Sequence, residues 1–177
     1  MSSLVTQLTE IEAGLSKLQD RLEDLPITEI LISRLLINLG REMNNRLDER
    51  LRPYGLTEAE FRALVSLHSF PEGSANPGDL CGGMGQSPAN ITRITDVLVE
   101  RGLILRLPDA HDRRRLVLQV TPQGVTLLNE LLPLMMEGVR ESYRSFTPAK
   151  RDQLLASLKA LAAAIDQLND HQSEGGT

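Results

Sequence analysis

The sequence predicts a mainly α-helical chain that carries one small β-hairpin. Over most of the 177 residues, apolar side chains recur at the three- and four-residue spacing of a helix face. The exception is the run "LILRLPDAHDRRRLVLQV" (residues 103–120), where two short alternating segments flank a polar loop. With 41% hydrophobic residues, the chain suits one domain, or one domain with long appended helices.

The first helix is indicated by leucine and isoleucine residues spaced alternately four and three apart. The spacing is a heptad seam, which predicts a helix that packs lengthwise on another helix and ends at Pro26. A second helix is expected from about Ile27 to Arg52. Its first half, "ILISRLLINL", is apolar nearly all round, which predicts burial between other elements. The seam consists of Leu4, Leu8, Ile11, Leu15, Leu18, Leu22 and Leu25.

Three helices follow, two of them with clear start signals. The run "TEAE" at residues 57–60 is a capping box, and the helix that it opens ends near the breaker-rich loop "FPEGSANPG". A short helix over residues 78–84 precedes a tight turn. Ser87 then caps a stronger helix, in which Pro88 takes the first position and Gly102 stands just past the end.

Two strands and two long helices complete the chain. The strands are expected at residues 103–107 and 115–120. Thr121-Pro122 and Thr147-Pro148 repeat the cap-plus-proline start, and they open helices over about 122–145 and 148–170. Pro133 should kink the first of these helices. The second carries another seam, made of Leu154, Leu158, Leu161, Ile165 and Leu168.

This order of elements is that of a winged helix-turn-helix with helices at both ends. We expect residues 55–121 to form the DNA-binding lobe. Residues 1–54 and 122–170 are expected to dimerise, because a seam without a partner exposes a long apolar stripe. Residues 171–177 are expected to form a polar tail.

The charge of the chain is unevenly distributed. The net charge of −5 rules out a globally basic nucleic-acid binder. Residues 86–116, however, hold six Arg against four acidic residues, whereas the rest of the chain holds thirteen Lys and Arg against twenty acidic residues. Such polarity favours a local binding face for DNA.

The start of the second helix of a helix-turn-helix meets the bases in the major groove. Asn can pair with adenine and Arg with guanine through two hydrogen bonds. Ser87 is a helix cap, and a cap can also touch phosphate. The candidates for DNA binding here are Gln86, Ser87, Asn90, Thr92 and Arg93.

The hairpin tip adds a second set of candidates. Arg113 and Arg114 are best placed to enter a neighbouring minor groove, whose narrow A·T tracts attract arginine. Asp112 either forms a loop-stabilising Asx turn or holds a wing arginine in place. Arg115 begins a strand and can instead pair with a carboxylate such as Asp109. Arginines on a loop are also common on solvated surfaces, but their position after a capped helix-turn-helix favours DNA.

The run "NPGDLCGGMGQSPANITRITDVLVERGLILRLPDAHDRRRLVLQVTPQG" resembles the MarR family of transcriptional regulators. The capped helix ends in "LVERGLI", and the wing signature follows as Asp-Arg-Arg, a strand, Thr, and Gly three residues on. Similarity covers roughly residues 25–170. The segment "EILISRLLINL" and the N-terminal extension resemble a branch that regulates multidrug efflux pumps.

The resemblance implies a homodimer on a pseudo-palindromic double-stranded DNA operator. Members usually act as repressors, and small aromatic or phenolic acids commonly release them. By position, the resemblance supports Ser87, Asn90 and Arg93 on the helix and Asp112, Arg113 and Arg114 in the wing. Pro88 and Ala89 depart from it, since other members often carry polar residues there.

One arginine stands within the apolar segment "ILISRLLINL". A charge in such a segment needs an anion or solvent, so Arg34 either forms a salt bridge, for example across a dimer, or anchors the carboxylate or phenolate of an effector. In the family, ligands lie between the dimerisation helices and the DNA-binding lobe. Asn38, Met43 and His68 are therefore further effector candidates, although a surface role explains His68 as well.

Several other classes of function find no support. The sequence shows no nucleophile–base pair, phosphate loop or metal-ligand spacing among its three His, so we expect no enzyme, cofactor or metal site. The single Cys81 excludes an internal disulfide and, without a basic neighbour, does not favour a redox sensor. Absence of a signal-peptide pattern and of an apolar span predicts a cytoplasmic protein that does not enter a membrane. A winged helix that binds protein rather than DNA remains the alternative.

Overall fold

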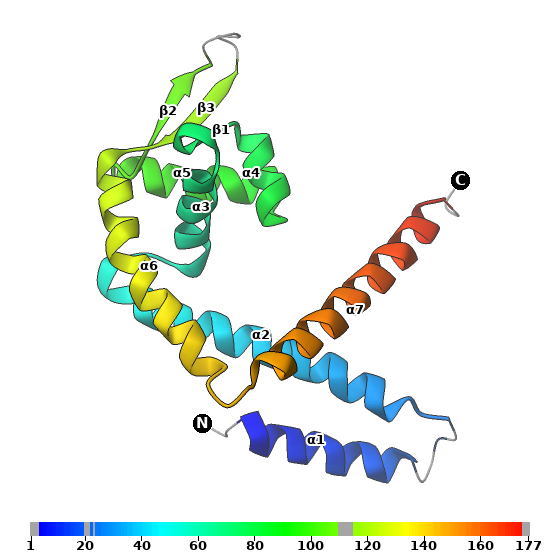
Figure 1. Cartoon of the computed structure of the whole chain (residues 1–177). Helices are drawn as coiled ribbons and strands as arrows, with labels where there is room; N and C mark the ends of the chain where they lie inside the picture. The colour runs from blue at the N-terminus through cyan, green and yellow to red at the C-terminus, as the bar shows by residue number, and fades with distance from the viewer. Residues whose placement is uncertain (1–3, 20–21, 23, 110–114, 175–177) are drawn as a thin grey trace. The chain divides into compact units, whose positions relative to one another are not determined.

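The chain is mainly helical, with a small three-stranded antiparallel sheet (Figure 1). The structure is a computed structural model that describes residues 4–19, 22, 24–109 and 115–174. It divides into two units, residues 1–128 and 129–177. The boundary falls within one long helix. The predicted fold class is confirmed.

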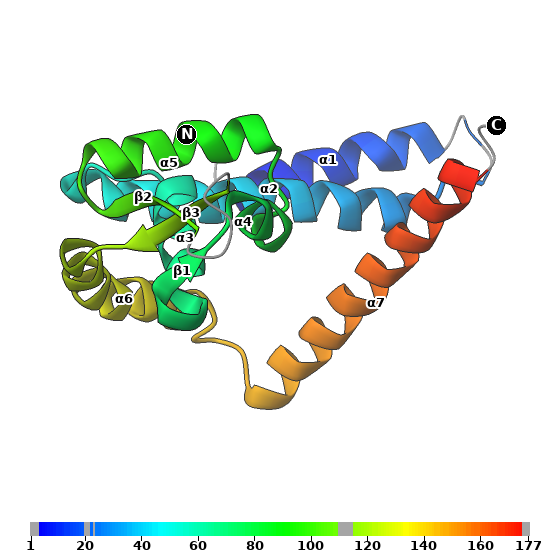
Figure 2. The same cartoon turned by 90° about the horizontal axis from the view of Figure 1, so that it is seen from above.

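Two antiparallel helices begin the first unit. Helix α1 (Leu4–Gln19) lies along α2 (Ile27–Leu51) in both views (Figures 1 and 2), and a 3-10 turn, η1 (Arg52–Tyr54), follows. Four seam side chains, Leu4, Leu8, Ile11 and Leu15, are half-buried, as the heptad spacing predicts. Leu18 and Leu22 are 44% and 48% exposed, and α1 ends at Gln19 rather than at Pro26, so the prediction is wrong for the end of the seam.

The predicted burial of the first half of α2 is wrong for the single chain. Helix α1 covers one side of α2, and large apolar side chains elsewhere on α2 stay exposed. The exposed fractions are 45% for Ile32, 37% for Leu36, 63% for Ile37 and 42% for Leu39.

Three helices build the core of the winged lobe. Helices α3 (Glu58–Ser69), α4 (Pro77–Met84) and α5 (Pro88–Glu100) pack on one another. The predicted capping box is present, since Thr57 Oγ1 accepts from the Glu60 N–H and Glu60 Oε2 accepts from the Thr57 N–H. Burial of each large apolar side chain contributes about 1.5–3 kcal/mol. Six side chains of these helices are at most 1% exposed: Leu64, Leu67, Leu80, Ile91, Ile94 and Leu98.

The sheet has three strands rather than the two of a simple hairpin. Strands β2 (Ile104–Pro108) and β3 (Leu116–Val120) pair antiparallel, with Ile104 opposite Val120. Strand β1 (Ser74–Ala75) follows the turn η2 (Pro71–Gly73) and pairs with the other edge of β3. The sequence predicts a loop there, because two residues are too few to show alternation.

Two long helices end the chain. Helix α6 (Pro122–Ser142) continues through Pro133, and α7 (Pro148–Glu174) follows. Helix α7 extends four residues into the predicted polar tail, because "HQSE" contains no Pro or Gly to stop it. Its seam side chains remain 37–62% exposed in the single chain: Leu154, Leu158, Leu161, Ile165 and Leu168.

Candidate nucleic-acid interface

A three-residue turn sets the start of α5. Gly85 has φ 61, a left-handed conformation that glycine adopts without steric cost, and it ends α4. Ser87 Oγ accepts a hydrogen bond from the Asn90 N–H at 3.3 Å, so Ser87 is the cap that the sequence predicts. The side chains around this start therefore occupy the position of the DNA-contacting end of a helix-turn-helix.

Helix α5 has one buried and one exposed face. Ile91, Ile94 and Leu98 face the core. On the opposite face, exposed side chains include Ser87, Pro88, Ala89, Thr92, Arg93 and Asp96, whereas Gln86 and Asn90 are half-buried. The predicted DNA contacts on this helix thus lie together, and none belongs to the core.

Asn90 joins two of the other predicted contacts. Its Nδ2 donates to Gln86 Oε1 at 2.6 Å, and its Oδ1 accepts from Arg93 Nη2 at 3.1 Å. Arg93 Nε is also near Asn90 Oδ1, at 3.4 Å. Both polar atoms of the Asn90 amide are therefore engaged, so this side chain orients the guanidinium of Arg93 before any DNA is present.

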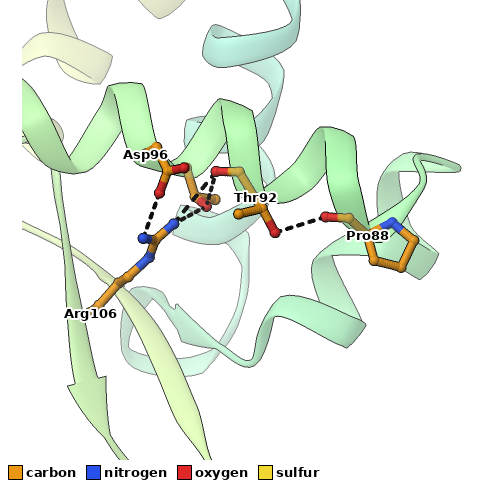
Figure 3. Close-up of polar contacts among 5 residues, drawn as sticks. Pro88, Thr92, Asp96 and Arg106 are labelled. Atoms are coloured by element: carbon orange, nitrogen blue, oxygen red, sulfur yellow. Dashed lines mark hydrogen bonds and ion pairs between the residues drawn. The ribbon is translucent and has the colours of Figure 1, made fainter.

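Thr92 is differently placed. Its hydroxyl donates to the carbonyl of Pro88 at 2.9 Å (Figure 3), so its single donor is used within the helix. The exposed side chain retains its methyl group and its acceptor capacity. A methyl group at this position suits contact with thymine better than donation to a base.

The wing strands run up to the segment that carries the predicted arginines. Beyond the paired strand ends, the Asp109 N–H donates to the Arg115 carbonyl at 3.0 Å, which continues the hairpin. Arg115 is exposed. Asp112, Arg113 and Arg114 lie outside the described residues, so their predicted roles stay predictions.

The base of the wing is tied to α6 by the Thr and Gly of the wing signature. Thr121 Oγ1 donates to the carbonyl of Gly102 at 2.7 Å and accepts from the Gly124 N–H at 3.0 Å. A Cβ at Gly124 would lie 2.3 Å from the carbonyl oxygen of Leu103, so only glycine fits. These two signature residues are structural.

Two arginines that the sequence-based prediction did not assign to the site make contacts across the fold. Arg101 Nη1 and Nη2 donate to the carbonyls of Gly55 and Tyr54 at 2.6 and 2.7 Å, which fixes the end of α5 to the turn before α3. Arg106 extends from β2 to Asp96 of α5 (Figure 3). The only signal for Arg106 in the sequence is a charge within the apolar run "LILRL".

The predicted effector residues are spread over two helices. Arg34 is exposed on α2, Asn38 Oδ1 accepts from Arg41 Nη2 at 2.6 Å, and Met43 is 43% exposed. His68 is exposed near the end of α3, beside Gly73. Within the described part of the chain, no hydrogen bond or ion pair joins His68 to these α2 side chains, and an effector site stays a prediction.

Among residues 4–19, 22, 24–109 and 115–174, no His, Cys, Asp and Glu side chains gather in groups of three or more that could hold a metal ion. Helices long and apolar enough to cross a membrane are likewise absent from these ranges.

The fold and the capped helix beside a hairpin wing define a winged helix-turn-helix protein. Residues 54–115 match the model of the MarR family. The chain is 33% identical over 163 residues to the transcriptional repressor MprA of Escherichia coli K12, which covers 92% of this chain and 93% of MprA. The chain therefore belongs to the MarR family of transcriptional regulators.

Solved structures agree with this assignment. AbsC, a MarR family transcriptional regulator from Streptomyces coelicolor, superposes with a TM-score of 0.74 at 23% identity, over 82% of this chain and 99% of AbsC. A cysteine-to-serine mutant of Escherichia coli MarR complexed with operator DNA superposes with a TM-score of 0.70 at 25% identity, over 78% and 99%. The expectation that the chain is not an enzyme is confirmed, because its relatives are transcriptional regulators.

Proposed function

We propose that the chain is a repressor that binds a pseudo-palindromic operator as a homodimer. Helix α5 enters the major groove, and the wing reaches the adjacent minor groove. The observation that carries the proposal is the linked polar cluster of Gln86, Asn90 and Arg93 at the exposed start of α5. The repressor MprA and the operator complex of Escherichia coli MarR support it.

Different side chains take different roles in this complex. Arg93 pairs with guanine, and Asn90 either pairs with adenine or holds Arg93. The neighbouring side chains contact the DNA backbone or nearby base edges; they are Gln86, Ser87 and Thr92. Asp112, Arg113 and Arg114 form the contacts of the wing tip.

Dimerisation is supported by apolar stripes at both ends of the chain. Residues 1–54 and 122–170 form the dimer layer in this proposal, and residues 55–121 form the DNA-binding lobe. Ile37 is 63% exposed and Leu168 is 62% exposed in the single chain. Such stripes are typical of surfaces that bury against a second copy.

Selection from a randomised duplex library tests the proposed function. We expect the wild-type protein to enrich an inverted repeat whose half-sites are about 10 base pairs apart, one helical turn. Arg93→Ala changes an exposed side chain, so it should fold normally and lose preference at one position in each half-site. A winged helix that binds protein instead of DNA would enrich no sequence, and this outcome would overturn the proposal.

An effector completes the proposal. A small aromatic or phenolic acid binds near Arg34, Asn38, Met43 and His68 and favours a spacing of the two α5 helices that no longer fits the grooves. Tenfold release requires about 1.4 kcal/mol of differential binding. The regulated genes would then belong to a multidrug efflux or aromatic-compound response.

Titration of salicylate against the complex with the selected duplex tests this part separately. Arg34→Gln should abolish release. Arg46→Gln is the matched control, because Arg46 is an exposed α2 arginine that pairs with Glu42. If salicylate and related acids release nothing from the wild-type complex, the aromatic-acid hypothesis is wrong while the DNA-binding proposal stands.

A further inference from the structure

A single guanidinium connects the wing to the helix proposed to read DNA. Arg106 Nη1 lies 2.5 Å from Asp96 Oδ1 (Figure 3). Arg106 Nη2 donates to Thr95 Oγ1 at 2.8 Å. The same Nη2 is 3.5 Å from the carbonyl oxygen of Thr92. One strand residue thus contacts polar groups of three residues, Thr92, Thr95 and Asp96, within about one turn of α5.

The register of the sheet explains why Arg106 faces α5. Side chains two apart on a strand share a face, and Ile104, two residues before Arg106, is fully buried. Opposite Arg106 in the ladder is Leu118, which is also fully buried. The Arg106 side chain therefore projects from the same face of the sheet as Ile104 and Leu118, and it extends from that face to α5.

The partners on α5 receive the guanidinium in a defined orientation. Thr95 is 2% exposed, and its hydroxyl donates to the Thr92 carbonyl at 3.0 Å, which leaves its oxygen free to accept from Arg106. The planar guanidinium can direct one nitrogen to Asp96 and the other to Thr95 at once. A lysine ammonium can reach the carboxylate but does not provide this fixed fork.

Stability alone is a weak explanation for this contact. The Arg106 and Asp96 side chains are 32% and 54% exposed, and ion pairs exposed to this degree contribute little to folding. The contact instead joins two elements, α5 and β2, that must meet neighbouring grooves of one duplex together.

We propose that Arg106 is a positioning residue that holds the wing at a fixed angle to α5, so that both elements engage the duplex at the same time. The inference rests on the proposed function, since it concerns the geometry of that DNA-binding surface. It assigns a role in DNA binding to a side chain that does not itself touch the duplex.

Amide hydrogen exchange of the free protein tests, without DNA, whether the contact of Arg106 with α5 stabilises the wing. In Arg106→Gln and in Asp96→Asn, we expect exchange in β2 and β3 to become at least about threefold faster. The double variant should be no faster than either single variant, because both changes remove the same contact. Arg106→Lys should fall between the wild type and Arg106→Gln. Arg62→Gln is the control, because its pair with Glu58 lies within one helix.

Binding to the duplex selected by the wild-type protein tests the consequence. Arg106→Gln should raise the Kd roughly tenfold, as one mismatched base pair does, with no change in the slope of log K against log salt. A slope smaller by about one, with unchanged exchange, would instead make Arg106 a phosphate contact and overturn the proposal.

Two other results would also overturn the positioning role. One is unchanged exchange in Arg106→Gln, and the other is faster exchange with unchanged affinity. Failure of the wild type to select any duplex would refute the proposed function, and the exchange measurements would still decide whether Arg106 ties the wing to α5.

Discussion

A single methyl group added at Gly124 should disrupt the base of the wing. Gly124 lies in the first turn of α6, and a Cβ there would lie 2.3 Å from the Leu103 carbonyl oxygen and 2.9 Å from Val120 Cγ1. The Leu103 oxygen accepts a hydrogen bond from the Thr121 N–H at 3.0 Å. It cannot retreat from alanine without weakening that bond.

The size of the effect follows from these contacts. Overpacking costs about 1–3 kcal/mol, and the hydrogen bond contributes about 1 kcal/mol. Alanine offsets about 1 kcal/mol through its better helix propensity. We therefore expect Gly124→Ala to lower the free energy of unfolding by about 1–3 kcal/mol. For a chain of this size, the Tm should fall by about 5 °C.

Urea unfolding followed by circular dichroism measures this change. The matched control is Gly82→Ala, because Gly82 lies within α4 and its Cβ would meet no heavy atom within 4 Å. This control should leave stability unchanged or raise it by up to about 1 kcal/mol. The steric argument is refuted if Gly124→Ala is as stable as the wild type, or if both variants shift the midpoint alike.

Three further substitutions probe other contacts. Arg101→Met removes the two bonds to Tyr54 and Gly55 and should cost about 1–2 kcal/mol in urea unfolding; unchanged stability would show that the tie is dispensable. Asn90→Ala should weaken binding of the selected duplex in fluorescence anisotropy, and Arg93→Ala should then add less than it does alone; full additivity would mean that Asn90 does not hold Arg93. Arg114→Ala should weaken binding across all sequences and lower the salt slope by about one, and wild-type affinity would exclude the wing contact.

Features that depend on neighbours along the chain could be predicted from the sequence. The caps at Thr57 and Ser87 involve hydrogen bonds to residues three positions later, so the sequence spacing contains the whole interaction. The buried face of α5 follows from the three- and four-residue spacing of Ile91, Ile94 and Leu98. The exposed polar start of α5 follows from the same periodicity.

Features that depend on residues far apart in the sequence could not be predicted from it. Strand β1 exists only because Ser74 pairs with Gln119, and neither residue signals the other. Arg106 and Asp96 meet only when β2 folds back against α5. The apolar first half of α2 resembles a buried helix in the sequence, because hydrophobicity does not distinguish a core from an exposed apolar surface.

The central claim is that α5 reads the operator. Its most direct test is the Kd with which Arg93→Ala binds the selected duplex, measured by fluorescence anisotropy and compared with that of Arg62→Ala. Both side chains are exposed, so both variants should fold as the wild type does, but only Arg93 lies in the cluster with Asn90. We expect Arg93→Ala to bind at least about tenfold more weakly, and to lose discrimination at one base pair. Arg62→Ala should bind as the wild type does. Equal affinity of the two variants would contradict the claim that α5 reads the operator.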